Sequence, residues 1–110
     1  MEIKEIKKDA IMILEVDGRL DASTSPALEQ KFLSLLEQGY NDLVIDFSQL
    51  QYISSAGLRV LLLAAKRTSA SGGRLALCAL KDNIREVFEI SGFTAIFQIH
   101  PTQEKAVGSF

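Results

Sequence analysis

The sequence predicts an α/β domain with a mixed sheet of about five strands and about four helices. Short apolar segments rich in β-branched residues alternate with longer segments whose apolar residues recur at helical spacing. Only Lys8-Asp9 separates the first two strand-like segments, so these two must pair antiparallel, whereas helices separate the later strands and favour parallel pairing. The 110 residues, 47% of them hydrophobic and 24% charged, fit one globular domain over residues 1–110.

Two strands and a helix are expected in the first part of the chain. The strands span residues 3–7 and 10–16, and Asp17-Gly18 closes the second one. Ser25 is placed to cap the helix, and Gly39 ends it because a left-handed closing residue favours glycine. One apolar stripe marks the buried face of this helix: Leu28, Phe32, Leu35 and Leu36.

Strands and helices continue to alternate in the rest of the chain. A polar stretch, residues 48–55, separates the third strand from a strongly apolar helix that we expect to be buried on more than one face. The expected strands lie at 43–47, 74–79 and near 96–99, and a helix is expected from about 56 to 69. Asp82 is placed to cap a further helix, which buries Ile84, Val87 and Phe88 and ends at Gly92. A last helical turn or two is expected after Pro101.

Composition excludes several function classes. The net charge of −2 gives no electrostatic footprint for nucleic acid, and no apolar run suits a signal peptide or a membrane span. A single cysteine, Cys78, and a single histidine, His100, exclude a disulfide framework and a cysteine/histidine zinc cage. Without a signal peptide or a membrane span we expect a cytoplasmic protein, and a monomer is the simplest assembly. No nucleotide-binding loop or hydrolase elbow is present, so we expect a non-enzymatic protein without cofactor or metal.

Candidate functional residues gather where strands lead into helices. Residues 18–24, 48–57 and 80–83 follow the expected strands, and such loops meet beyond the carboxyl edge of a parallel sheet. Ser54 and Ser55 stand together at the start of the apolar helix. Either serine can be a simple N-cap, but only one cap is needed, and a helix N-terminus also tolerates a phosphate. A cap and a phosphorylation site are therefore both open.

Residues 46–58, DFSQLQYISSAGL, resemble the signature of the STAS domain, and within it the stand-alone bacterial anti-sigma factor antagonists. Gly18-Arg19-Leu20-Asp21 matches a second element of that family. Residues 87–93, followed by Phe97, resemble its C-terminal pattern. The similarity therefore covers nearly the whole chain in the expected order.

The resemblance implies a phosphorylation-controlled partner switch. The unmodified protein would bind an anti-sigma factor that is also a serine kinase, phosphorylation would release it, and a PP2C-type phosphatase would reset it. By residue match the phosphate acceptor is Ser55. Ser54, which stands where the family often has Asp, is the second choice. The alternative is an unphosphorylated STAS scaffold or an accessory subunit of a transporter or signalling complex. The implied partner-binding residues are Asp21, Ser23, Thr24, Ser54, Ser55, Gly57, Leu58 and Arg59.

Charge gives such a switch a physical basis. We expect Asp21 and Asp46 near the same sheet edge, which makes the face acidic, and a phosphate adds about −1.5 to −2 charges. A like charge on the partner about 6 Å away would cost on the order of 3 kcal/mol, or about a hundredfold in affinity. Asp46 can instead accept loop N–H groups, and Arg59 is either a solvated helix residue or a partner for phosphate. Cys78 is expected in the core and His100 in solvent.

Overall fold

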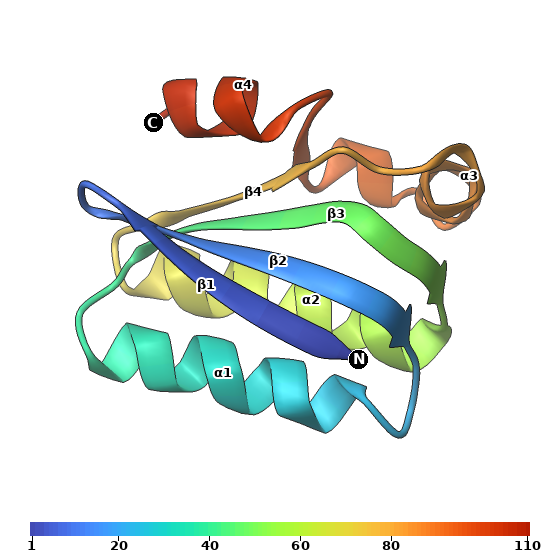
Figure 1. Ribbon diagram of the computed structural model, residues 1–110, viewed down its shortest axis with the longest axis horizontal. Helices are drawn as coiled ribbons and strands as arrows, with labels where there is room; N and C mark the ends of the chain where they lie inside the picture. Colours follow the sequence, from blue (N-terminus) through green and yellow to red (C-terminus); the bar gives the residue numbers. More distant parts are fainter.

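One five-stranded sheet, in which the strands lie side by side in chain order, organises the molecule (Figure 1). The computed structural model describes residues 1–110. β1 and β2 pair antiparallel across a turn at residues 9–10, and all later neighbours pair in parallel, which confirms the mixed sheet predicted from the sequence. The strands are β1 (Glu2–Lys8), β2 (Ile11–Leu20), β3 (Asp42–Ile53), β4 (Arg74–Cys78) and β5 (Gln98–His100).

The helices cover both faces of the sheet unequally (Figure 1). Two long helices, α1 (Ser25–Glu37) and α2 (Ser55–Ala70), lie on one face, and the short α4 (Gln103–Gly108) lies on the other. A third helix, α3 (Asp82–Ile90), and the 3-10 turn η1 (Phe93–Ala95) pack at the end of the sheet. None of these helices combines the length and the apolar character that a membrane crossing needs.

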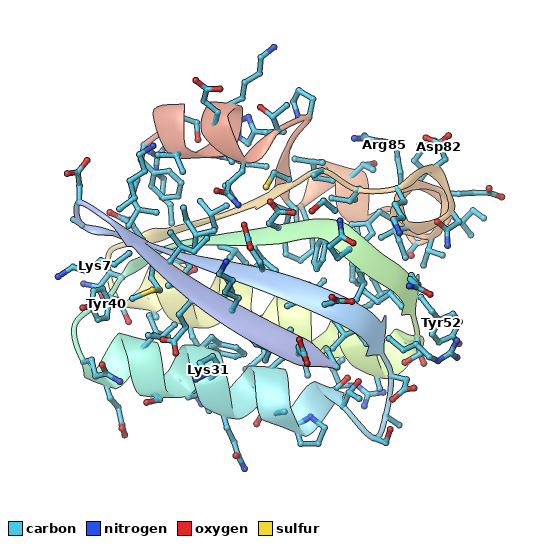
Figure 2. All side chains as sticks on the ribbon, viewed as in Figure 1. Lys7, Lys31, Tyr40, Tyr52, Asp82 and Arg85 are labelled. Carbon is cyan, nitrogen blue, oxygen red and sulfur yellow. The ribbon has the colours of Figure 1, made fainter.

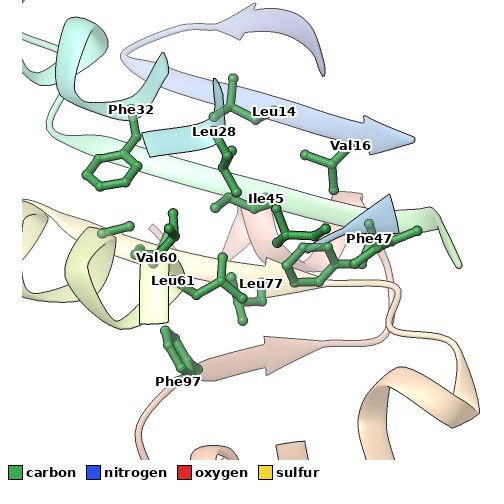
Figure 3. Close-up of a cluster of buried hydrophobic side chains, with 14 of the residues drawn as sticks. Leu14, Val16, Leu28, Phe32, Ile45, Phe47, Val60, Leu61, Leu77 and Phe97 are labelled. Atoms are coloured by element: carbon green, nitrogen blue, oxygen red, sulfur yellow. The ribbon is translucent and has the colours of Figure 1, made fainter. Parts of the chain in front are cut away.

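The main hydrophobic core lies between the sheet and the long helices (Figure 3). On α1, Leu28, Phe32 and Leu35 of the predicted stripe are fully buried, whereas Leu36 is half-buried. Phe88 brings α3 into this core, with its ring centroid 6.3 Å from that of Phe47. A smaller cluster under α4 fills the other face: Ile11, Ile13, Val44, Ala76, Cys78 and Ala106.

The two central strands are longer than the sequence analysis predicted. β2 does not end at Asp17-Gly18, because Gly18, at φ +108°, lies in an irregular stretch of the ladder after which pairing with β3 resumes. β3 continues through the expected polar stretch as far as Ile53, which pairs with Leu20. Polar residues at 48–52 therefore belong to a strand, and the start of α2 lies directly at the strand end.

Two helix starts also differ from the prediction. Asp82 is the first residue of α3, after Lys81 at the cap position, and its side chain makes no cap hydrogen bond. At α1 the cap residue is Thr24, and Ser25 already belongs to the helix. The predicted ends are confirmed: Gly39 and Gly92 adopt the left-handed conformation, at φ +93° and +75°, just after α1 and α3.

Candidate functional site

The start of α2 gives its two serines different tasks. Ser54 occupies the cap position, and its Oγ accepts the N–H of Gly57 at 3.5 Å, while its own N–H donates to the carbonyl of Leu20 at 2.9 Å. Ser55, the first helical residue, is exposed, and its hydroxyl makes no hydrogen bond within the chain. The cap is thus provided by Ser54, and the hydroxyl of Ser55 stands free beside the N–H groups of a helix N-terminus.

The turn before α1 is organised around the carboxylate of Asp21. Its Oδ1 accepts the hydroxyl of Ser23 at 2.8 Å, the N–H of Ser23 at 3.0 Å and the N–H of Thr24 at 3.2 Å. The hydroxyl hydrogen bond from Ser23, with the backbone donors adding to it, lowers the pKa of Asp21 below its ordinary value. The carboxylate is therefore ionised at neutral pH and fixes the turn that leads into α1.

Ser25 has another role than the predicted cap, and it shares the polar groups of this turn with Thr24. Thr24 Oγ1 accepts the N–H of Asp21 at 2.9 Å and donates to the carbonyl of Arg19 at 2.8 Å. Ser25 is buried and donates its hydroxyl to the carbonyl of Asp21 at 2.5 Å. The turn thus satisfies its own polar groups, and neither hydroxyl serves as a cap for α1.

Two of the eight expected contact residues face inward. Gly57 is buried, and a Cβ there would lie 2.8 Å from Leu20 Cγ and 2.9 Å from the carbonyl oxygen of Leu20. Leu58 is 8% exposed and belongs to the core. These two residues hold α2 against the sheet, and their side chains offer a partner almost no surface.

Asp46 lies away from the other candidates, contrary to the expectation. It pairs with Glu15 and Cys78 in the middle of the sheet, and β3 runs seven more residues before it ends at Ile53. At about 3.3 Å per residue that distance is roughly 20 Å. Asp46 accepts the N–H of Ser48 at 2.8 Å, which agrees with a carboxylate that accepts nearby N–H groups.

The charges around Ser55 are mixed, whereas the sequence analysis expected an acidic surface. Without Asp46, the loops and helix starts of this edge carry two carboxylates, Asp21 and Asp82, and three cations: Arg19, Arg59 and Lys81. The segment 48–56 itself carries no charged residue. A phosphate on Ser55 would therefore shift the balance of this mixed surface towards negative charge.

A groove of about 470 Å³ runs beside Ser55 between α1 and α2. Its floor is apolar, with Val60 and Leu63 of α2, and its rim carries Arg59 and Lys66 opposite Glu29 of α1. The exposed Arg59 thus lies at the mouth of the groove one turn into α2. No sequence pattern indicates this groove, because it depends on how two helices pack.

Tyr52 and Arg19 also belong to this edge and were absent from the predicted contact residues. Tyr52 is 40% exposed at the end of β3, and the guanidinium carbon of Arg19 lies 4.2 Å from the centroid of its ring. A large aromatic residue among polar neighbours just before Ser54 is the signal that could have identified the pair.

Cys78 and His100 lie on the α4 side of the sheet, where they are register partners on the neighbouring strands β4 and β5. Cys78 is fully buried, as predicted, and burial together with nearby Asp46 and Glu15 raises its pKa to about 12. His100 is half-buried rather than exposed, because it is the last residue of β5, and its Nε2 has no hydrogen-bond partner. No group of three or more His, Cys, Asp or Glu side chains is arranged to hold a metal ion.

Comparison with known proteins agrees with this architecture. BtrV of Bordetella bronchiseptica, which carries the provisional name of an anti-sigma factor antagonist, is 40% identical and is matched over 100% of this chain and 95% of its own length. The anti-sigma-B factor antagonist of Bacillus subtilis is 30% identical, over 97% of this chain and 95% of the relative. SpoIIAA, a Bacillus cell fate determinant solved in its phosphorylated form, shares the fold with a TM-score of 0.77, 21% identity and 98% coverage of each chain.

The family profile of the STAS domain matches residues 2–106, which include every strand, the free serine at the start of α2 and the Asp21 turn. Together with the relative that is 40% identical over the full chain, this match shows that the protein belongs to the STAS domain family.

Proposed function

We propose that this chain is an anti-sigma factor antagonist, and that phosphorylation of Ser55 controls its binding to an anti-sigma factor with serine kinase activity. The observation that carries the proposal is the division of labour between the two serines. Ser54 caps α2, so the exposed hydroxyl of Ser55 is free to accept a phosphate without loss of the cap. The names of two relatives, and the solved phosphorylated form of a third protein of the same fold, support the same function.

The helix N-terminus favours the modified state of the protein itself. The free N–H groups of the first turn and the positive end of the helix dipole stabilise negative charge at Ser55. No refolding is needed, because Ser55 is already at the surface. The phosphate therefore acts on the contact with the partner, where added bulk and about two negative charges oppose binding.

Asp21 fits a role in partner contact. Its Oδ1 organises the turn, but its Oδ2 takes no hydrogen bond and lies 3.8 Å from Arg19 Nε. A basic side chain of the partner can pair with this second oxygen. Ser23 and Thr24, expected as contacts, support that carboxylate through their hydroxyl and N–H groups.

The reset of the switch requires a phosphatase, and we propose one of the PP2C type. The exposed position of Ser55 makes a phosphate at this site accessible to such an enzyme as well as to the kinase.

Mass spectrometry tests the proposed acceptor. The purified chain is incubated with ATP and an extract of its native host, in parallel with Ser55→Ala and Ser54→Ala, and the phosphate is mapped by fragmentation. We expect one phosphate on Ser55 in the parent and in Ser54→Ala, and none in Ser55→Ala. A phosphate on Ser54 alone would contradict the assignment, because it would place the modification on the cap.

A further inference from the structure

Arg19 and Tyr52 form a stacked pair at the exposed edge of the sheet. They are register partners at the ends of β2 and β3, and the guanidinium lies 4.2 Å from the ring centroid. Both are exposed, the side chain of Arg19 to 62% and Tyr52 to 40%. Figure 2 shows Tyr52 at the end of β3, on the same side of the molecule as α3 with Asp82 and Arg85.

The guanidinium of Arg19 is held in place by the ring, but its hydrogen-bond donors have no acceptor within the chain. Stacking on an aromatic ring restricts its plane, so less side-chain entropy is lost when it binds a further group. It donates no hydrogen bond within the chain, and the nearest carboxylate oxygen, Oδ2 of Asp21, lies 3.8 Å from Nε. The terminal N–H groups are thus available to a planar acceptor, and a carboxylate matches their geometry with two parallel hydrogen bonds.

A small excess of positive charge surrounds the pair. Arg19, Arg59 and Lys81 lie at this end of β2, α2 and β4 together with two carboxylates, Asp21 and Asp82, and segment 48–56 between them is uncharged. Complementary charge across an interface fixes the register of binding and raises the association rate. Tyr and Arg are moreover the residue types most enriched among the side chains that dominate binding energy at interfaces.

We propose that Arg19, held on the ring of Tyr52, binds a surface carboxylate of the anti-sigma factor and thereby helps to select this partner. The inference rests on the proposed function and names the chemistry of the partner: an acidic patch that meets the guanidinium of Arg19 beside Ser55. It also explains the direction of the switch. A phosphate on Ser55 adds negative charge where this patch docks, and it competes with the patch for the same cations.

Binding measurements with matched variants test the role of Arg19. The unmodified chain, Arg19→Gln, Tyr52→Ala and Tyr52→Phe are titrated calorimetrically with the purified anti-sigma factor from the same host. We expect Arg19→Gln to raise the Kd by about tenfold or more, as for a central interface residue. Tyr52→Ala should weaken binding by a smaller factor, because the guanidinium remains but is no longer held, and Tyr52→Phe should keep the parent Kd.

Arg67→Gln is the control variant. Arg67 is equally exposed and positive, but it lies in the last turn of α2, at the far end from Ser55. We expect its Kd to stay within about twofold of the parent, since rim charges have little effect on affinity. Thermal unfolding followed by circular dichroism verifies that each variant is folded.

A double-mutant cycle identifies the carboxylate. Exposed Asp and Glu residues of the anti-sigma factor are changed one at a time to Asn or Gln and titrated against the parent chain and against Arg19→Gln. We expect one change that weakens binding to the parent but has no further effect in the Arg19→Gln background.

Three results would overturn the inference. Arg19→Gln could bind the anti-sigma factor with the affinity of the parent, or the double-mutant cycle could find no carboxylate coupled to Arg19. The third result is a change in affinity by Arg19→Gln that is confined to the Ser55-phosphorylated chain. The last would assign Arg19 to the phosphate instead. Failure of the unmodified parent to bind the anti-sigma factor is a different outcome, because it would refute the proposed function itself.

Discussion

Gly57 shows how a single absent side chain sets the position of the site. An added Cβ would lie 2.8 Å from Leu20 Cγ and 2.9 Å from both Ile53 Cγ1 and the carbonyl oxygen of Leu20. The first turn of α2 can approach the strand ends this closely only with glycine there. The residue that the sequence analysis assigned to partner contact therefore has a packing role, which places Ser55 at the edge of the sheet.

We predict that Gly57→Ala lowers the free energy of unfolding by about 1–3 kcal/mol, because the overpacking outweighs the better helix propensity of alanine. Urea denaturation measures the change. Gly108→Ala is the matched control, since a Cβ at that helical position meets nothing within 4 Å. Equal stability of Gly57→Ala and the parent would contradict the close packing described for α2.

The carboxylate of Asp21 gives a prediction for pH. Hydrogen bonds, first that from the Ser23 hydroxyl, lower its pKa in the folded state. A depressed carboxyl pKa stabilises the fold at pH values above the unfolded value of about 3.9, and this contribution is lost as the pH falls through the folded value. An NMR titration should place the midpoint of Asp21 below its ordinary value, and Ser23→Ala should raise it.

Ser34→Ala is the control for this titration. Ser34 lies on α1, where it accepts a hydrogen bond from Gln38, and it is no partner of Asp21. Its replacement should leave the Asp21 midpoint unchanged. An identical midpoint in the parent and in Ser23→Ala would show that the hydroxyl does not stabilise the carboxylate.

At the scale of elements, one side chain of α4 links this helix to two strands of the sheet by hydrogen bonds. Gln103 Nε2 donates to Glu15 Oε2 and to Asp46 Oδ2, each at 2.8 Å, and these two carboxylates are register partners on β2 and β3. One amide thus bridges two neighbouring negative charges beneath a helix of six residues. This contact explains how an acidic residue is accommodated in the middle of β3.

We predict that Gln103→Ala lowers the free energy of unfolding by about 2 kcal/mol, because two carboxylates lose their donor. Gln103→Glu should cost more, since it adds a third negative charge, and the difference should shrink in acid. Urea denaturation gives the stabilities, and hydrogen exchange shows whether α4 opens first. Glu104→Gln changes an exposed position and should have the same free energy of unfolding as the parent. Similar losses of stability in Gln103→Ala, Gln103→Glu and Glu104→Gln would contradict the bridge.

The elements were predictable from the sequence where local signals define them. The stripe Leu28, Phe32 and Leu35 and the glycines that end α1 and α3 mark their helices through periodicity and backbone conformation. The extension of β2 and β3 was not predictable in this way. Pairing between strands some thirty residues apart carries the ladder through residues 48–52, although most of these residues are polar and the segment resembles a loop.

At the scale of the whole molecule, the candidate site was predictable in part. The convergence of the β2–α1 and β3–α2 segments follows from parallel topology, and the N–H of Ser54 indeed donates to the carbonyl of Leu20. The position of Asp46 could not be derived, because it depends on where β3 ends. That one difference replaces the expected acidic surface around Ser55 by one of mixed charge, on which Arg19, Arg59 and Lys81 accompany Asp21 and Asp82.

The mixed charge also changes how the switch works. The expected mechanism added a phosphate to an acidic face, whereas here the phosphate adds negative charge to a face that carries cations as well as carboxylates. Repulsion between the phosphate and acidic groups of the partner then adds to the neutralisation of Arg19 and Arg59. Both effects act only on the complex, so the isolated domain should keep its fold after modification.

The most direct test of the account is the affinity of the purified anti-sigma factor for the unmodified chain and for the chain phosphorylated at Ser55, measured by calorimetry under the same salt conditions. We predict that the phosphate raises the Kd by about a hundredfold, which corresponds to roughly 3 kcal/mol of electrostatic opposition at the contact. Treatment with a PP2C-type phosphatase should restore the original Kd. Equal affinity of the two forms, with Ser55 fully phosphorylated, would contradict the account.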